Sequence, residues 1–148
     1  MSRTFFTDRD LGKALPDSLR AAGFAVERFD DHFGPTTADE DWLATVGKRG
    51  WTVLTHDERI RYKPTERDAV MKHGVGLILL IGDAPHPALG RNVINSRDSL
   101  EAFLDATPVP FIAKLYRPSP GELARNPEAA GRVELWLSHA AWKRRPRG

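Results

Sequence analysis

The chain has 148 residues, of which 41% are hydrophobic and 28% are charged, and its formal net charge is +2 at pH 7. These values are ordinary for a globular protein, and the length predicts one domain over residues 1–148 with a substantial core. Because the chain contains no cysteine, disulfide bonds, thiolate zinc sites and a cysteine nucleophile are excluded.

The first half of the chain alternates between strand and helix patterns. Three short segments have the apolar or alternating pattern of strands, namely residues 4–7, 24–29 and 51–55. Residues 15–22 are predicted to form a helix, because Pro16 suits a first turn and Gly23 suits the end of a helix. A loop that contains Gly34 and Pro35 follows the second strand.

A second helix is predicted from residue 37 to residue 49. Thr37 and Glu40 have the spacing of a capping box, in which two side chains satisfy free backbone N–H groups at the helix start. We therefore expect Thr37 to be the N-cap and Glu40 to serve that structural role, with the helix ending at Gly50.

The second half of the chain continues the alternation. Helices are predicted at residues 65–73 and from Ser96 onward, and strands at residues 75–81 and 109–116. The proline-rich segment 118–127 is predicted to be a loop. Residues 133–137 alternate in polarity and are expected to pair with 109–116 as a C-terminal β-hairpin extension. This order predicts an α/β fold with a central, mostly parallel sheet and helices on both faces.

Carboxylates lie where the predicted strands end and where the second helix begins. Asp8 follows the first strand, Asp57 follows the third, and Asp39 lies in the first turn of that helix. Because the carboxyl ends of parallel strands meet at one edge of a sheet, we expect these residues to gather there. Oxygen ligands suit Mg²⁺ or Mn²⁺, so a divalent metal site is the functional hypothesis.

Each of these acidic residues also has a purely structural explanation. Asp8 and Asp57 could form turns, and acidic residues in a first turn complement the helix dipole. Asp41 is a weaker candidate ligand than Asp39. Side chains two residues apart in a helix point about 200° away from each other, so only one of the two should face the site. The sequence leaves several candidates for a fourth acid, or none: Asp10, Glu40, Asp41, Glu58, Glu66, Asp68 and Asp83.

Basic residues cluster in two places. Arg59, Arg61 and Lys63 follow Asp57, where they could bind the phosphates of a nucleic acid or form a solvated surface. Residues 143–147 form a second basic cluster, which is most simply a solvated chain end.

The acidic motifs together resemble those of the PIN-like domains, which include the VapC-type toxins of bacterial toxin–antitoxin pairs. The resemblance rests on Thr7-Asp8, on Asp39 with Trp42, and on Thr55-x-Asp57, and it covers residues 4–81. It implies a three-layer fold and a ribonuclease that depends on Mg²⁺ or Mn²⁺, with Asp8, Asp39 and Asp57 as catalytic metal ligands. It also implies RNA as substrate and a small antitoxin protein as partner, and a homodimer is a further expectation. We place the motif-bearing core at residues 4–116 and an extension at 117–148.

Two other functions stay open at this level. The protein could be an inactive PIN-like interaction module, in which the acidic residues only cap turns and helices. It could instead be an aspartate-based phosphotransfer domain with Asp8 or Asp10 as acceptor, although Lys114 lies inside a predicted strand rather than after one.

The expected compartment is the cytoplasm. The segment that begins with Met1 lacks the pattern of a secretory signal peptide, and the longest apolar run, residues 76–81, is too short to cross a bilayer. We therefore expect no contact with a membrane.

Overall fold

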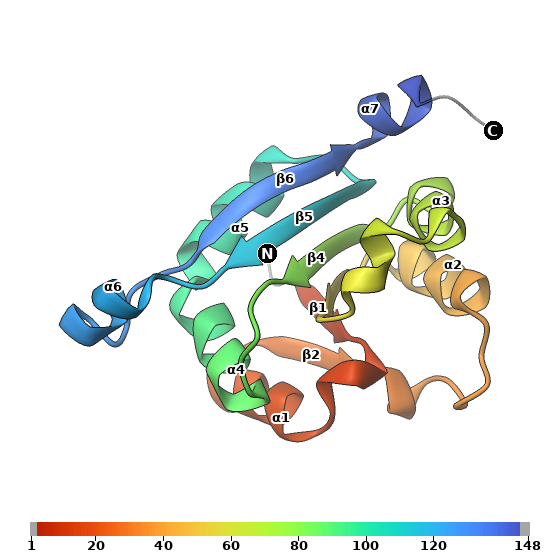
Figure 1. The fold of residues 1–148 in the computed structure, drawn as a ribbon. Helices are drawn as coiled ribbons and strands as arrows, with labels where there is room; N and C mark the ends of the chain where they lie inside the picture. Colours follow the sequence, from red (N-terminus) through yellow and green to blue (C-terminus); the bar gives the residue numbers. More distant parts are fainter. Residues whose placement is uncertain (1–2, 146–148) are drawn as a thin grey trace.

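The computed structural model describes residues 3–145, so the predicted basic residue Arg147 lies outside the described part, as do Met1 and Ser2. A six-stranded sheet with the order β2-β1-β3-β4-β5-β6 forms its centre (Figure 1). The strands are β1 (Thr4–Thr7), β2 (Ala25–Arg28), β3 (Thr52–Thr55), β4 (Gly76–Leu80), β5 (Phe111–Tyr116) and β6 (Arg132–Ser138). The first five are parallel and β6 runs antiparallel to β5, which confirms the predicted mostly parallel sheet and its antiparallel last strand.

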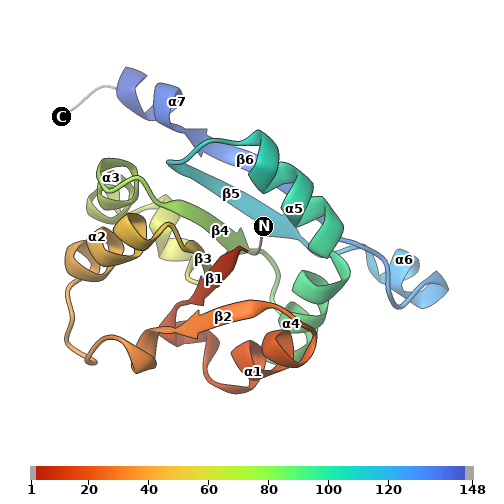
Figure 2. The same ribbon diagram turned by 180° about the vertical axis from the view of Figure 1, so that it is seen from behind.

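Helices cover both faces of the sheet (Figures 1 and 2). One face carries α1 (Ala14–Ala21), α4 (His86–Asn95) and α5 (Arg97–Ala106), and the other carries α2 (Asp39–Arg49) and α3 (Pro64–Lys72). Two short helices near the C-terminus are α6 (Pro120–Arg125) and α7 (His139–Arg144). Three 3₁₀ turns are η1 (Arg9–Leu11), η2 (Phe29–Asp31) and η3 (Glu58–Arg61).

The alternation of side chains along the strands creates two cores, one on each face of the sheet. In β1, Phe5 packs with α1, α4 and α5, whereas its neighbour Phe6 packs with α2 and α3. In β3, Leu54 packs in the core with α1, α4 and α5, and Val53 packs in the core with α2 and α3. Successive strand residues point to opposite faces, so apolar runs without a polar face bury the sheet on both sides.

The order of the strands places a crevice between β1 and β3. The chain passes from β1 to β2 through α1 on one face and then returns through α2 on the other face to β3. These opposite crossovers leave β1 and β3 as neighbours, which is the topological switch point where open α/β sheets bind ligands.

The structure corrects two local predictions. The predicted capping box at Thr37 is wrong: Ala38 is the N-cap of α2, without a side-chain cap, and Glu40 bonds to Lys72 and His73 instead. The predicted loop at residues 118–127 contains α6, because Ser119 accepts a hydrogen bond from the backbone N–H of Glu122.

Helix α4 was not predicted at all from the sequence. Pro85 is its N-cap and Pro87 lies in its first turn, a place that proline suits. Leu89 and Val93 lie one turn apart on its buried side. Within residues 3–145, every helix is too short or too polar to span a lipid bilayer.

Candidate functional site

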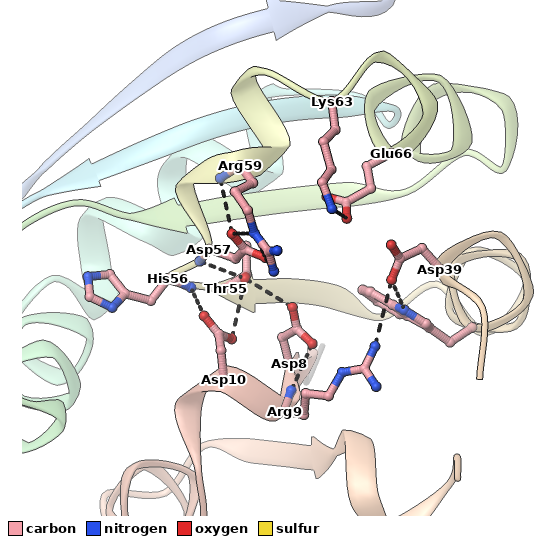
Figure 3. A network of polar contacts seen from close by, with 11 residues as sticks. Asp8, Arg9, Asp10, Asp39, Thr55, His56, Asp57, Arg59, Lys63 and Glu66 are labelled. Carbon is pink, nitrogen blue, oxygen red and sulfur yellow. Dashed lines mark hydrogen bonds and ion pairs between the residues drawn. The ribbon is translucent and has the colours of Figure 1, made fainter. Parts of the chain in front are cut away.

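A cavity of about 370 Å³ lies at the carboxyl ends of β1 and β3. Five acidic residues from four segments of the chain line it: Asp8, Asp10, Asp39, Asp57 and Glu66. Three basic residues, Arg9, Arg59 and Lys63, share the lining. Figure 3 shows these side chains converging from β1 and η1, from the start of α2, from the end of β3 and from α3.

Thr55, the last residue of β3, connects three of the acidic residues. Its buried hydroxyl oxygen lies 3.1 Å from Asp8 Oδ2 and 3.4 Å from Asp10 Oδ1, so it can donate to either carboxylate. The same oxygen accepts a hydrogen bond of 3.1 Å from the backbone N–H of Asp57. The end of β3 therefore fixes the position of Asp57 relative to Asp8.

Burial and mutual repulsion act on the acidic residues after β1. Burial, followed by the nearby charge of Asp10, raises the pKa of Asp8 to about 6. Burial also raises the pKa of Asp10, although its carboxylate accepts a 3.0 Å hydrogen bond from the backbone N–H of His56. Negative charge is thus crowded here beyond what the local donors compensate.

Asp57 has a different environment, because Arg59 neutralises it. The Arg59 guanidinium donates to both carboxylate oxygens, with Nε at 2.9 Å from Oδ1 and Nη2 at 2.8 Å from Oδ2. This contact lowers the pKa of Asp57 below its ordinary value. Asp57 also accepts from the backbone N–H of Arg59, and Asp8 from that of Arg9, so both aspartates cap 3₁₀ turns.

Asp39 and Glu66 bring together the starts of α2 and α3. Burial and the hydrogen bond with Asp39 raise the pKa of Glu66 to about 7. Burial acts to raise the pKa of Asp39 as well, but hydrogen bonds from Glu66 and Trp42 outweigh it and lower the pKa. Trp42 Nε1 donates to Asp39 Oδ1 at 3.0 Å. Of the two carboxyl groups, Glu66 therefore has the higher proton affinity.

The basic side chains at the rim of the cavity are held in place by contacts within the protein. Arg9 Nη1 donates to the carbonyl oxygen of Pro35 at 2.7 Å, and its guanidinium lies over the ring of Phe29. Arg9 Nη2 lies 3.8 Å from Asp39 Oδ1. Lys63 Nζ lies 3.9 Å from Glu66 Oε1. Positive groups thus surround the acidic residues, where an anionic ligand would have to enter.

The structure brings Asp8, Asp39 and Asp57 to one cavity, while their role as metal ligands stays a prediction. Asp41 and Asp83 are exposed and do not belong to the lining. Of the predicted RNA-binding residues, Arg59 and Lys63 line the cavity and Arg61 does not. Arg61 pairs with Glu58, and its guanidinium lies over the exposed ring of Tyr62.

Sequence reasoning gave no clear place to two of the five acidic residues, Asp10 and Glu66. The spacing of Asp8 and Asp10 was a usable signal, because a turn after β1 can return both side chains to the same strand end. Glu66 had no comparable signal, since its approach to Asp39 depends on how α3 packs against α2. The other candidates near it point elsewhere: Asp68, for example, accepts a hydrogen bond from Trp142 Nε1.

The chemistry of the lining suits Mg²⁺ or Mn²⁺, because all five acidic residues offer carboxylate oxygens. The raised pKa values of Asp8 and Glu66 show uncompensated negative charge that a divalent cation would neutralise. In residues 3–145, however, no three His, Asp or Glu side chains are arranged to hold one ion together. Asp57 is turned to Arg59, so this pair would have to open before Asp57 could serve as a ligand.

Comparison with known proteins points to one family. The profile described as "PIN like domain" matches residues 3–82, a segment that contains all five acidic residues of the cavity. Over 77 residues the chain is 36% identical to a Mycobacterium tuberculosis protein named "Putative ribonuclease VapC45". This alignment covers 49% of the chain and 56% of that protein, so the chain spans little more than half the length of this curated relative. No solved structure matches the chain.

Proposed function

We propose, from the premise that this chain belongs to the family of PIN-like domains, that it is a metal-dependent ribonuclease. The observation that carries the proposal is the cavity between β1 and β3, where five acidic residues meet three basic ones. Turns and caps alone do not account for it, because burying Asp8 next to Asp10 raises the pKa of Asp8 instead of satisfying its charge.

In this proposal Asp8, Asp39 and Asp57 hold Mg²⁺ or Mn²⁺, and Asp10 and Glu66 complete the oxygen donors. The bound ion would supply charge neutralisation and an activated water for cleavage of a phosphodiester bond. Thr55 orients Asp8 through its hydroxyl group and fixes the backbone of Asp57.

Residues of the chain can also account for the proton at the site and for the negative charge of the phosphate groups. Without metal, Glu66 has a pKa of about 7, so it would release its proton when the ion binds near neutral pH. Arg9, Arg59 and Lys63 are proposed to bind phosphate oxygens, because they already face the acidic cavity. Arg61 would contact only a flanking phosphate, since it lies outside the lining.

The proposed substrate is single-stranded RNA or an exposed loop, because a splayed backbone reaches a cavity more easily than a paired one. The resemblance to VapC-type toxins supports two further parts of the proposal, a role as the toxin of a toxin–antitoxin pair and a small antitoxin protein as partner. Action in the cytoplasm and a homodimer belong to the same proposal.

The test is cleavage of a defined single-stranded RNA by the purified protein, with Mg²⁺ or Mn²⁺ and with a chelator. Asp8→Asn, Asp39→Asn and Asp57→Asn should each abolish cleavage, since each removes a ligand charge and keeps the side-chain volume. Asp41→Asn is the matched control, because it makes the same change on an exposed residue of α2 outside the cavity.

Thermal melting of all four variants would confirm that they are folded. Wild-type turnover in two of the three cavity variants would remove the proposed site. Absence of both RNA cleavage and stabilisation by Mg²⁺ or Mn²⁺ would instead favour an inactive interaction module.

A further inference from the structure

One face of the β5–β6 strand pair is only partly covered by helices: Ile112 and Leu137 are buried in the core that includes α3 and α7, whereas the rest of the face, from Lys114 onward, carries no helix from the described residues 3–145. Figure 2, the view from behind, shows α5 packed on one face of these strands. Figure 1 shows their opposite face, which is open beside η3 and α3. The open face is on the same side of the sheet as α2 and α3, because Ile112 in β5 and Leu137 in β6 belong to that core. The cavity also uses this side, through Leu43 and Leu77.

Basic and aromatic residues occupy the open face. Lys114 and Tyr116 alternate with Ile112 along β5, so they point to the same side, and Arg132 pairs in register with Tyr116. Lys114 Nζ lies 5.8 Å and the Arg145 guanidinium 5.6 Å from the ring centre of Trp136. The Arg132 guanidinium lies 4.7 Å from the ring centre of Tyr116. We call these five residues, Lys114, Tyr116, Arg132, Trp136 and Arg145, the β5–β6 strip.

The charge of the chain is divided between its two parts. Up to residue 110 the sequence has 14 Lys and Arg against 17 Asp and Glu, whereas from residue 111 it has eight Lys and Arg against three Glu. The segment that builds the acidic cavity is thus net negative, and the segment that builds the strip is net positive. Glu134 of β6 lies on the same face, in register with Lys114 and 3.4 Å from Arg132, so the face carries three cations against one carboxylate.

The strand ends connect the strip to the cavity. His56, next to Asp57, contacts the carbonyl oxygen of Gly82 through Nε2 at 2.7 Å. Ile81 N–H donates to the carbonyl oxygen of Leu115 at 2.9 Å, one residue before Tyr116. Neighbouring strands are about 4.8 Å apart, so β3 and β5 are separated by roughly 10 Å at this edge. One or two nucleotides could span that distance.

We propose that the β5–β6 strip binds the part of a single-stranded RNA that flanks the nucleotides in the cavity. The inference rests on the proposed function and adds the path of the substrate. Cations beside aromatic rings on an open sheet face suit a sugar–phosphate backbone with stacking bases. An acidic protein would be attracted by the cations, but its carboxylates would not stack on the aromatic rings as bases do.

The experiment compares RNA binding by the full chain in a chelator, so that cleavage does not interfere. The test variant is Lys114→Gln, Arg132→Gln and Arg145→Gln together. The control variant is Lys13→Gln, Lys48→Gln and Arg91→Gln, which removes three exposed cations from other surfaces. Two RNAs are used, one of about 20 nucleotides that could reach the strip and one of about 4 nucleotides that could fill only the cavity.

For the long RNA, the strip variant should bind roughly tenfold more weakly and its salt dependence should lose about two units of slope, because three phosphate contacts disappear. The control variant and the short RNA should show little change. Trp136→Leu should weaken binding of the long RNA at high salt, because salt screens the contacts with the cations and leaves stacking on the ring as the larger contribution. If the triple variant melts early, Arg132→Gln alone replaces it, because that side chain is 70% exposed.

Three outcomes would overturn the inference. One is equal affinity of the strip variant and the wild type for the long RNA. Another is an equal loss for the long and the short RNA. The third is a strip that binds polyglutamate as tightly as RNA with no effect of Trp136→Leu, which would indicate an acidic protein. A wild type that cleaves RNA in any of these cases keeps the proposed function, whereas one that neither binds nor cleaves RNA loses both.

Discussion

Thr55 is the residue through which the acidic side chains after β1 and β3 are connected. We expect Thr55→Val to lower the free energy of unfolding by about 1–2 kcal/mol, because Asp8 loses a buried donor and the N–H of Asp57 loses its acceptor. Mn²⁺ affinity should fall as well, since both ligands lose their orientation. Thr55→Ser keeps the hydroxyl group and is the control. A valine variant with the melting temperature and Mn²⁺ affinity of the wild type would contradict this role.

The crowded carboxyl groups predict a characteristic pH dependence without metal. Asp8 and Glu66 have pKa values raised from 3.8 to about 6 and from 4.5 to about 7. The folded state therefore binds these protons more tightly, so their stabilisation is complete below the unfolded pKa values and is lost as the pH rises through about 6 and 7.

Asp8→Asn isolates the part of this effect that belongs to Asp8. Relative to the wild type, the variant should gain up to about 3 kcal/mol of stability between pH 4 and pH 7, because it has no carboxyl group to ionise. Urea denaturation across this pH range, in a chelator, measures the difference. Parallel pH profiles for the two proteins would show that Asp8 titrates normally.

At the level of single residues, the sequence allowed part of the cavity to be predicted. Asp8 and Asp57 could be placed together because each directly follows a strand of a parallel sheet, and such ends converge. Glu66 could not be chosen over Glu58 or Asp68, since a helix start alone does not say which side chain faces a neighbouring helix. Its position became apparent only from the contact with Asp39.

Among the elements, α2 and α3 pack against each other, with Asp39 and Glu66 at their starts and a close contact near their ends. Gly47 permits this packing, because a Cβ atom there would lie 2.0 Å from the carbonyl oxygen of His73. Gly47→Ala should therefore cost roughly 1–3 kcal/mol of stability and weaken metal binding by separating the helices. Gly34→Ala is a fair control, since the nearest atom to its Cβ would be 3.9 Å away. Equal melting curves for the two variants would refute this account of the helix contact.

Elements were predictable where one pattern dominated and were missed where two patterns competed. The continuous apolar run at residues 76–80 could only be buried, and it forms the central strand β4. Helix α4 begins within prolines that also suggest a turn, and its helical nature depends on packing of Leu89 and Val93 against α1 and the sheet. Thr37 had the right spacing for a capping box, but Lys72 and His73 of the neighbouring helix bind Glu40 and leave the box unformed.

For the molecule as a whole, the alternation of elements was enough to predict a mostly parallel sheet, because right-handed crossovers leave few other arrangements. The structure was needed to see that the acidic cavity and the basic face are built by two different parts of the chain. The acidic cavity is built entirely from residues 8–77, and the open basic face is built by strands and a helix that follow residue 110. The pairing of β6 with β5, which the alternation at residues 133–137 predicted, joins this late segment to the same sheet.

The central claim is that the cavity between β1 and β3 binds a divalent metal ion, and calorimetric titration with Mn²⁺ tests it most directly. We expect saturable binding near neutral pH that weakens below about pH 6, where Asp8 and Glu66 keep their protons. Asp8→Asn and Asp57→Asn should lose this binding, whereas Asp41→Asn should retain it. Absence of Mn²⁺ binding to the folded wild-type protein, or equal binding by all three variants, would contradict the account.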